Sequence, residues 1–345
     1  MFGVAYAMPS VINTHFDMET ADPDDVMTLC MLSHHPLVNL VSVSITPGSR
    51  AQVGLVRHVL ARLEKDIPVG SRKVNHTKDC VSEFHYKWLG QIGVAEPDGT
   101  GAEVMERSLH KYPDLNIICG ASLGNIGALL DLDVVVPRIV VQGGFAGESI
   151  VDPEHMLEKF RGRVTCPTFN LNGDVTSAKK LLNSMKVDRR LFVSKNVCHG
   201  VIYDGDFHDW IQRQPFINPG VALLIEGMTA YRGKRAGWGR REGEGKDKAF
   251  HDPLAAAALI DQRVCEFKEV ELYSEKGPYG HEWGSRYSED PNCKISVSMN
   301  KPMFRDLVVG RYWVDAQIVP ASPPHDPPPS IEDIDDLLDT RFYTE

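Results

Sequence analysis

Five carboxylates fall within nine residues near the amino end of the chain, in the segment FDMETADPDDV. They belong to Asp17, Glu19, Asp22, Asp24 and Asp25. Ionised carboxylates this close repel one another, and a hard divalent cation relieves the repulsion because Ca²⁺ and Mg²⁺ prefer oxygen ligands. The segment therefore predicts a metal site.

A purely structural interpretation explains only part of this cluster. Asp22, Asp24 and Asp25 can favour the start of a helix by capping it and by interacting with its dipole, each by roughly 0.3–1 kcal/mol. Asp17 and Glu19 are not explained in this way, because they alternate at the end of a predicted strand and would share one face. The metal interpretation accounts for both groups.

Short apolar runs alternate with longer segments of helical periodicity along most of the chain. Strands are predicted at 11–16, 40–46, 115–120, 138–144 and 190–195, with peripheral strands at 267–274 and 294–300. Helices are predicted at 24–35, 52–63, 125–132, 174–185, 220–231 and 252–260. This alternation indicates an α/β fold with an open, mostly parallel sheet flanked by helices. Ligands bind such sheets at the carboxyl ends of the strands, where the acidic segment lies.

The composition limits the class of protein. The chain is 42% hydrophobic and 24% charged, as in ordinary globular proteins, and its net charge of −10 argues against a general nucleic-acid binder. Seven cysteines without a CxxC pair suggest neither a zinc site nor a disulfide framework. No signal peptide or membrane span is evident, so a cytoplasmic protein is expected. We expect one domain over 1–320 and a Pro-rich, acidic tail over 321–345.

The acidic segment resembles the signature DxDxxxDD of the inosine–uridine-preferring nucleoside hydrolase family. Asp17-Met18-Glu19 matches its first half and Asp24-Asp25 its second, with Glu19 in place of Asp and one additional residue between the halves. Similar motifs follow in the family's order: CGASLGNIGALL at 119–130, RIVVQGG at 138–144, PTFNLNGDVTSAKKLL at 167–182 and HDPLA at 251–255. The resemblance covers Val11 to about residue 300 and implies a Rossmann-like core.

The resemblance also implies roles for individual residues in cleaving the N-glycosidic bond of a nucleoside. It implies Ca²⁺, with Mg²⁺ as the alternative, bound by Glu19, Asp25, Asp252 and a backbone carbonyl expected at Gly124. Asp24 and Asn170 would contact the ribose, His85 would line the site, and His251 would act as general acid at the base. For the proton of the attacking water we expect Glu19 as base, with Asp17 as the alternative.

Three segments depart from the family pattern or carry a further hypothesis. The family's EFN is Thr168-Phe169-Asn170 here, and its VxGN is Thr46-Pro47-Gly48-Ser49, so the sugar's surroundings differ. The Gly-rich basic segment 231–248 is interpreted as a surface loop or a phosphate-binding lid, in which Trp238 could stack on a base. Cys198 and His199 are interpreted as strand neighbours on opposite faces rather than a nucleophile pair.

Two alternatives stay open beside the hydrolase. A non-catalytic protein that binds nucleosides on the same scaffold would keep the fold and the metal. A Mg²⁺-dependent phosphotransferase also begins with paired acids after a first strand, although Glu19 and HDPLA disfavour it. The expected partners are a nucleoside or a nucleoside-derived small molecule and, from the family resemblance, further copies in a homodimer or homotetramer.

Overall fold

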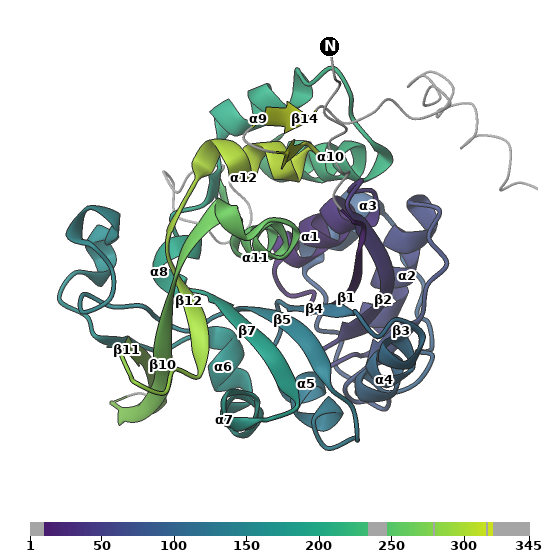
Figure 1. Cartoon of the computed structure of the whole chain (residues 1–345). Helices are drawn as coiled ribbons and strands as arrows, with labels where there is room; N and C mark the ends of the chain where they lie inside the picture. Colours follow the sequence, from purple (N-terminus) through teal and green to yellow (C-terminus); the bar gives the residue numbers. More distant parts are fainter. Residues whose placement is uncertain (1–9, 234–246, 279, 315–316, 320–345) are drawn as a thin grey trace, which may run out of the picture.

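The computed structural model describes residues 10–233, 247–278, 280–314 and 317–319 (Figure 1). Ten of its strands form one sheet: β1 (Ile12–Met18), β2 (Val38–Ile45), β3 (Val69–Ser71), β4 (Asn116–Cys119), β5 (Val136–Gln142), β6 (Thr165–Cys166), β7 (Val187–Val193), β10 (Cys265–Gly277), β11 (Gly280–Arg286) and β12 (Cys293–Met299). Two small ribbons pair β8 (Ile202–Tyr203) with β9 (Lys248–Ala249) and β13 (Tyr312–Val314) with β14 (Gln317–Val319). The predicted tail at 321–345 lies outside the described residues.

The strand order of the large sheet is β3-β2-β1-β4-β5-β7-β12-β10-β11-β6. The strands from β3 to β12 run parallel, and β10, β11 and β6 follow in antiparallel pairs. This confirms the open, mostly parallel sheet. The predicted peripheral strands are β12 and β10, which extend the sheet beyond β7.

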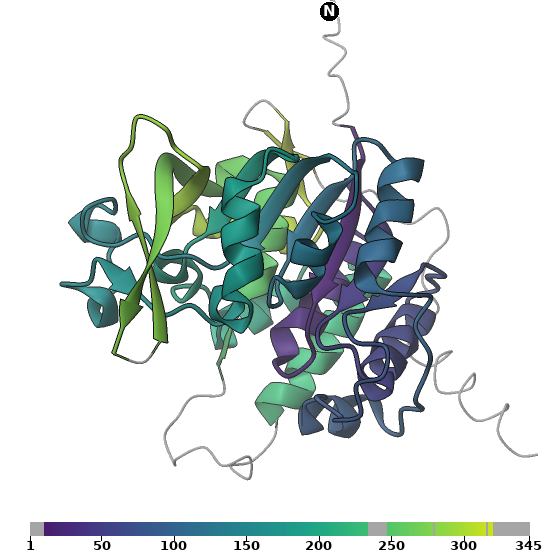
Figure 2. The ribbon, with the colours of Figure 1, turned by 90° about the horizontal axis from the view of Figure 1, so that it is seen from below.

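The helices lie on both faces of this sheet. Their bounds are α1 (Pro23–Ser33), α2 (Arg50–Arg62), α3 (Glu83–Leu89), α4 (Gly101–Lys111), α5 (Gly124–Leu129), α6 (Phe169–Gly173), α7 (Val175–Asn183), α8 (Lys195–Cys198), α9 (Gly205–Gln212), α10 (Pro219–Gly233), α11 (His251–Ile260) and α12 (Lys301–Val308). Apolar residues of α1, α2, α10, α11 and α12 belong to one core, and those of α4, α5 and α7 belong to a second. In Figure 2, α4 and α7 lie in front of the sheet as seen from below.

Alternation along the central strands separates the two cores. In β5, Val140 belongs to the core under α1 and α11, while Ile139 and Val141 belong to the core under α5 and α7. Leu191 and Phe192 of β7 divide in the same way. Strands buried on both faces are therefore apolar almost throughout, which is why short continuous apolar runs predicted them.

The chain order changes direction next to β1. From β1 the chain moves outward through β2 to β3, and it then returns to β4 on the other side of β1. The crossovers on the two sides therefore diverge and leave a crevice beyond the carboxyl ends of β1 and β4. The acidic segment, which follows β1 directly, opens into that crevice.

Candidate active site

A cavity of about 290 Å³ lies at the carboxyl ends of β1, β4, β5 and β7. Its lining residues are Glu19, Asp22, Asp24, Asp25, Gly120, Gln142, Gly143, Thr168, Phe169, Asn170, Lys195, His199, His251 and Asp252. The acidic side chains come from the segment around the start of α1 and from the first turn of α11, and the basic ones come largely from α8 and α11. The cavity thus carries groups of both charges.

Three buried carboxylates form the centre of the acidic wall. Oxygens of Asp24, Asp25 and Asp252 lie within 4.8 Å of one another, and Oδ1 of Asp252 is buried without a hydrogen-bond partner in the described structure. Burial, and then the charges of the neighbouring carboxylates, raise the pKa of both Asp25 and Asp252. Burying ionised carboxylates this close together costs electrostatic free energy. A hard divalent cation bound to their oxygens would stabilise the ionised forms and offset this cost.

Asp24 also has a structural contact that joins α1 to α11. Its Oδ2 accepts hydrogen bonds from the backbone N–H groups of His251 (2.9 Å) and Asp252 (3.3 Å). The N-cap residue of α11, Phe250, has no side-chain oxygen to accept these bonds. Asp24 therefore caps a helix that begins 227 residues later, and this contact places Asp252 beside Asp25.

Asp17 and Glu19 do not share a face, contrary to the strand alternation predicted for them. β1 ends at Met18, and Asp17 points into the second core, where its Oδ1 accepts from Ser44 Oγ (2.6 Å) and Asn125 Nδ2 (2.8 Å). Glu19 follows the strand and lines the cavity. Burial, and then the charges of Asp22 and Asp17, raise the pKa of Glu19 to about 7. Glu19 is thus the acid of this pair with access to a ligand.

Gly124, whose carbonyl is expected to be a metal ligand, is not among the residues that line the cavity. Gly124 is the first residue of α5, so its carbonyl points along the helix, and its Cα faces Arg72 and Asp174. Gly120 lies instead at the end of β4 and lines the cavity. A Cβ on Gly120 would come within 2.8 Å of the Asp252 carboxylate, so the absence of a side chain permits this close approach.

Asn170 and Thr168 form the wall that continues from β4 to β5. Asn170 Nδ2 donates to the carbonyl of Gly120 (3.0 Å) and to Oε1 of Gln142 (2.7 Å). Thr168 is buried, and its hydroxyl has no partner within the described part of the chain. Two segments depart from the family pattern, and the one that contains Thr168 lines the cavity. The other, at 46–49, does not line the cavity, and Ser49 caps α2.

His251 and His199 meet on the basic side of the cavity, with ring centroids 4.5 Å apart. Cys198 and His199 lie at the end of the short helix α8 rather than on a strand, which corrects the expectation for this pair. Sequence reasoning missed His199 because helix α8 is too short for its periodicity to be visible. Burial, followed by the charge of Lys248, lowers the pKa of His251 to about 4.

Of the two aromatic residues expected to contact the substrate, His85 and Trp238, the structure describes only His85. His85 is buried in α3 beside Phe84 and Trp88, and it does not line the cavity. Burial lowers the pKa of His85 to about 4, although the charge of Asp22 acts in the opposite direction. Trp238 falls outside the described residues.

Lys248 is a buried cation that sequence reasoning assigned to a surface loop. Pairing of β9 with β8 brings its ammonium to 2.7 Å from Asp22 Oδ1 and 3.4 Å from Asp24 Oδ1. Although burial alone disfavours the charged form, Asp24 and Asp22 raise the pKa of Lys248. The acidic wall is therefore partly neutralised by the chain itself.

Lys248→Met is expected to lower the free energy of unfolding by about 3 kcal/mol, because removing one partner of a buried ion pair leaves the other uncompensated. Urea unfolding in EDTA measures the effect. The matched control is Lys294→Met, since Lys294 pairs with Glu269 at 3.1 Å on the surface and should change stability by only about 0–1 kcal/mol. Equal losses in the two variants would contradict the buried pair.

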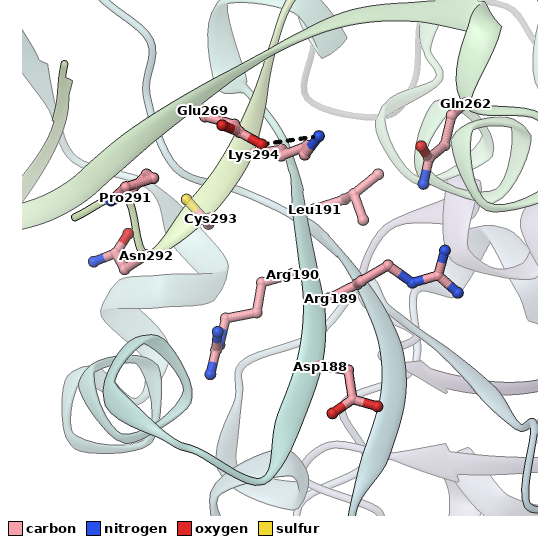
Figure 3. A pocket seen from close by; sticks show the side chains of 10 residues that line it. All are labelled: Asp188, Arg189, Arg190, Leu191, Gln262, Glu269, Pro291, Asn292, Cys293 and Lys294. Atoms are coloured by element: carbon pink, nitrogen blue, oxygen red, sulfur yellow. Dashed lines mark ion pairs between the residues drawn. The ribbon is translucent and has the colours of Figure 1, made fainter. Parts of the chain in front are cut away.

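A second pocket lies at the opposite edge of the sheet, around the first residues of β7 and β12 (Figure 3). Figure 3 shows the Glu269–Lys294 ion pair beside Cys293, with Arg189 and Arg190 below it. The pocket lies where parallel strands begin, away from the ends at which such sheets bind ligands. It contains none of the clustered carboxylates, so the first cavity is the candidate active site.

Comparison with known protein families identifies one family for this chain. The sequence profile of the inosine-uridine preferring nucleoside hydrolases matches residues 15–306. An uncharacterised protein of Aquifex aeolicus is 28% identical over 305 residues, which cover 87% of this chain and 99% of that protein.

Solved structures show the same fold. A plant nucleoside hydrolase has a TM-score of 0.66 at 17% identity, with 86% of this chain and 98% of that chain covered. An inosine-uridine preferring nucleoside hydrolase from Bacillus anthracis has a TM-score of 0.63 at 12% identity, with 86% and 98% covered. None of the helices in the described part of the chain has the length and apolar character needed to cross a membrane.

The family profile matches residues 15–306, which are most of the chain. The chain therefore belongs to the inosine-uridine preferring nucleoside hydrolase family, whose members are N-glycosyl hydrolases.

Proposed function

We propose that this protein uses Ca²⁺, held by Asp25 and Asp252, to hydrolyse the N-glycosidic bond of a nucleoside to free base and ribose. The observation that carries the proposal is the buried Oδ1 of Asp252, which has no partner among the described residues, on a carboxylate grouped within 4.8 Å with oxygens of Asp24 and Asp25. The carbonyl of Gly120 and the carboxylate of Glu19 line the same cavity and complete a set of oxygen donors. When bound, the cation would supply positive charge that orients and acidifies a water molecule.

Glu19 is the proposed base for that water. Its side chain lines the cavity beside the proposed cation ligands, and in the metal-free site burial, followed by the charges of Asp22 and Asp17, raises the pKa of Glu19 to about 7. Cleavage of an N-glycosidic bond develops positive charge on the ribose, and the ionised carboxylates beside the cavity stabilise this charge. Asp17 is proposed as a supporting residue, because its Oδ1 accepts from Ser44 and Asn125 and its Oδ2 from the Cys119 thiol.

The remaining proposed roles follow from position around the cavity. Asp24 and Asn170 are proposed to bind the ribose hydroxyls, and their other contacts hold both side chains in place. His251 is proposed to serve the departing base. Because burial keeps the pKa of its ring near 4, the ring is neutral at pH 7 and donates a hydrogen bond to the base.

The function is tested by incubating the purified protein with a panel of nucleosides, with Ca²⁺ or with EDTA, and by measuring free base chromatographically. We expect base release that requires the cation. Tight nucleoside binding with no base released would favour the non-catalytic alternative. Release of inorganic phosphate from nucleotides, with the glycosidic bond intact, would favour the phosphotransferase.

Ca²⁺ should raise the melting temperature more at about pH 8 than at about pH 5.5, because its ligands must be deprotonated to bind it. The raised pKa values of Asp25 and Asp252 mean that the metal-free folded protein holds protons that the unfolded chain has lost. Its stability therefore falls as the pH rises above the unfolded carboxyl pKa, and the cation reverses this loss. Calorimetric scans at both pH values measure the difference, and a Ca²⁺ effect independent of pH would contradict the assigned ligands.

The predicted homodimer or homotetramer and the cytoplasmic location stay predictions. Light scattering of the full chain measures the oligomeric state directly.

A further inference from the structure

The basic side of the cavity gathers cations that the proposed hydrolysis of a neutral nucleoside does not use. Lys195 lines the cavity next to Thr168, and its ammonium donates to the carbonyl of Pro167 at 2.7 Å. The ammonium of Lys159 lies 2.8 Å from Nδ1 of His199. Among the described residues neither lysine has a carboxylate partner, whereas the acidic wall is partly neutralised by its own Lys248. The two lysines therefore leave positive charge beside the cavity uncompensated.

The two lysines are held close together by one aromatic ring. The Lys159 ammonium lies 5.2 Å and the Lys195 ammonium 5.9 Å from the centroid of Phe160. Each contact favours the charged form, while the proximity of like charges disfavours it. Lys195 accordingly lowers the pKa of Lys159, after the larger effect of partial burial. An anion bound between them would relieve this repulsion.

The polar atoms on this side are donors. Because an ammonium can only donate, Nδ1 of His199 accepts from Lys159, and the neutral ring then carries its hydrogen on Nε2. The hydroxyl of Thr168 is buried with no partner among the described residues and can donate as well. The Lys195 ammonium, Thr168 hydroxyl and His199 Nε2–H are the complement of a phosphate or carboxylate group.

A metal ion fits this wall poorly, although Cys198, His199 and His251 place possible ligand atoms within 4.8 Å of one another. Nδ1 of His199 is occupied by Lys159, and the Cys198 sulfur accepts from Gln142 Nε2 at 3.2 Å. Burial also raises the pKa of Cys198 to about 12, so the thiol is not a thiolate. With two lysines beside it, this cluster favours an anion over a cation.

We infer that the substrate is an anionic nucleoside, whose phosphate or carboxylate group binds Lys195, Thr168 and His199 while its ribose lies against the carboxylates. The inference rests on the proposed hydrolysis for its chemistry, but the anion site itself rests on the donors described above. A nucleoside 5′-monophosphate and a nucleoside with a carboxylated base both supply the required group. Neutral nucleosides lack it.

The test compares uridine, uridine 5′-monophosphate and orotidine with the Ca²⁺-loaded full chain, and it measures base release as kcat/KM. At least one anionic substrate should exceed uridine, and the preferred one shows where the anion is attached. Lys195→Met should lower the anionic-to-neutral ratio of kcat/KM by roughly 10- to 100-fold, the usual effect of one charged hydrogen bond. Thr168→Glu, which places a carboxylate beside Lys195, should lower the ratio further. Lys179→Met, an exposed lysine of α7, is the matched control and should leave the ratio unchanged.

Calorimetric binding separates this inference from the proposed function. Ribose 5-phosphate should bind more tightly than ribose, or orotate more tightly than uracil, and Lys195→Met should remove the difference. If no substrate is hydrolysed but this Lys195-dependent binding is found, the proposed function fails and the anion site stands. If uridine is the best substrate and neither anionic probe binds more tightly than its neutral partner, the anion site is overturned and the hydrolase stands.

Discussion

Asp252→Asn is expected to abolish Ca²⁺ binding and to lower the rate of base release by about 10³-fold or more, because the charge that holds the cation is removed. The same substitution should stabilise the metal-free protein. Asp252 lies among buried carboxylates, its Oδ1 has no partner in the described structure, and repulsion from Asp24 and Glu19 raises its pKa beyond the effect of burial. A neutral amide of the same shape needs no proton to be buried there, so the cost of neutralising this side chain on folding, roughly 1–3 kcal/mol, is removed.

Two measurements are needed for this variant. Urea unfolding in EDTA gives the stability of the metal-free protein, and calorimetric titration with Ca²⁺ gives the affinity. Asp131→Asn is the surface control, since Asp131 pairs with Lys180 at 2.6 Å in an exposed position, and it should change neither quantity appreciably. If Asp252→Asn retains Ca²⁺ binding and activity, the cation is held elsewhere. If it is less stable than the parent in EDTA, the carboxylate has a structural partner that the cluster does not suggest.

Glu19→Gln is expected to lower kcat by roughly 10²- to 10⁴-fold, the usual effect of removing a general base. Ca²⁺ affinity should fall less than in Asp252→Asn, because Glu19 lies outside the group of Asp24, Asp25 and Asp252, whose oxygens lie within 4.8 Å of one another. The fold should be retained, since Glu19 lies just beyond β1 and lines the cavity rather than belonging to either hydrophobic core. Single-turnover base release at saturating Ca²⁺ measures the chemical step separately from metal binding.

Asp17→Asn is the matched comparison for Glu19→Gln. Ser44 Oγ and Asn125 Nδ2 both donate to Oδ1 of Asp17, so the carbonyl oxygen of an Asn can accept both bonds, and a loss of only about 1 kcal/mol in stability is expected. The folded fraction should keep most of its kcat. The opposite pattern, with activity lost in Asp17→Asn at full stability and kept in Glu19→Gln, would identify Asp17 as the base.

Much of the fold was predictable because its signals are local. The strands β1, β2, β4, β5 and β7 are short apolar runs, and each lies within a few residues of its predicted bounds. The starts of two helices were predictable for the same reason. Asp22 and Asp174 are N-cap residues whose side chains accept backbone hydrogen bonds, the role for which Asp is favoured. Such signals depend on neighbours a few positions apart, which any single sequence displays.

The candidate site was predictable in its residue types but not in their partners. The acidic segment and HDPLA identified Asp25 and Asp252 as one group, but the sequence could not show that Asp24 caps α11 or that Asp17 turns toward Asn125. The sequence also could not show that Gly120 lines the cavity, whereas Gly124 begins α5.

Lys248 and His199 show most clearly that the sequence does not reveal which side chains contact one another. Lys248 ends a basic, Gly-rich segment that looks exposed, and only the pairing of β9 with β8 carries its ammonium between Asp22 and Asp24. His199 reaches His251 because α8 and α11 meet at the end of the sheet. The sequence by itself determined which carboxylates and cations are available and where strands give way to helices. The tertiary structure alone decided which of them face one another, because those contacts join residues that are distant in the chain, up to 227 positions apart for Asp24 and His251.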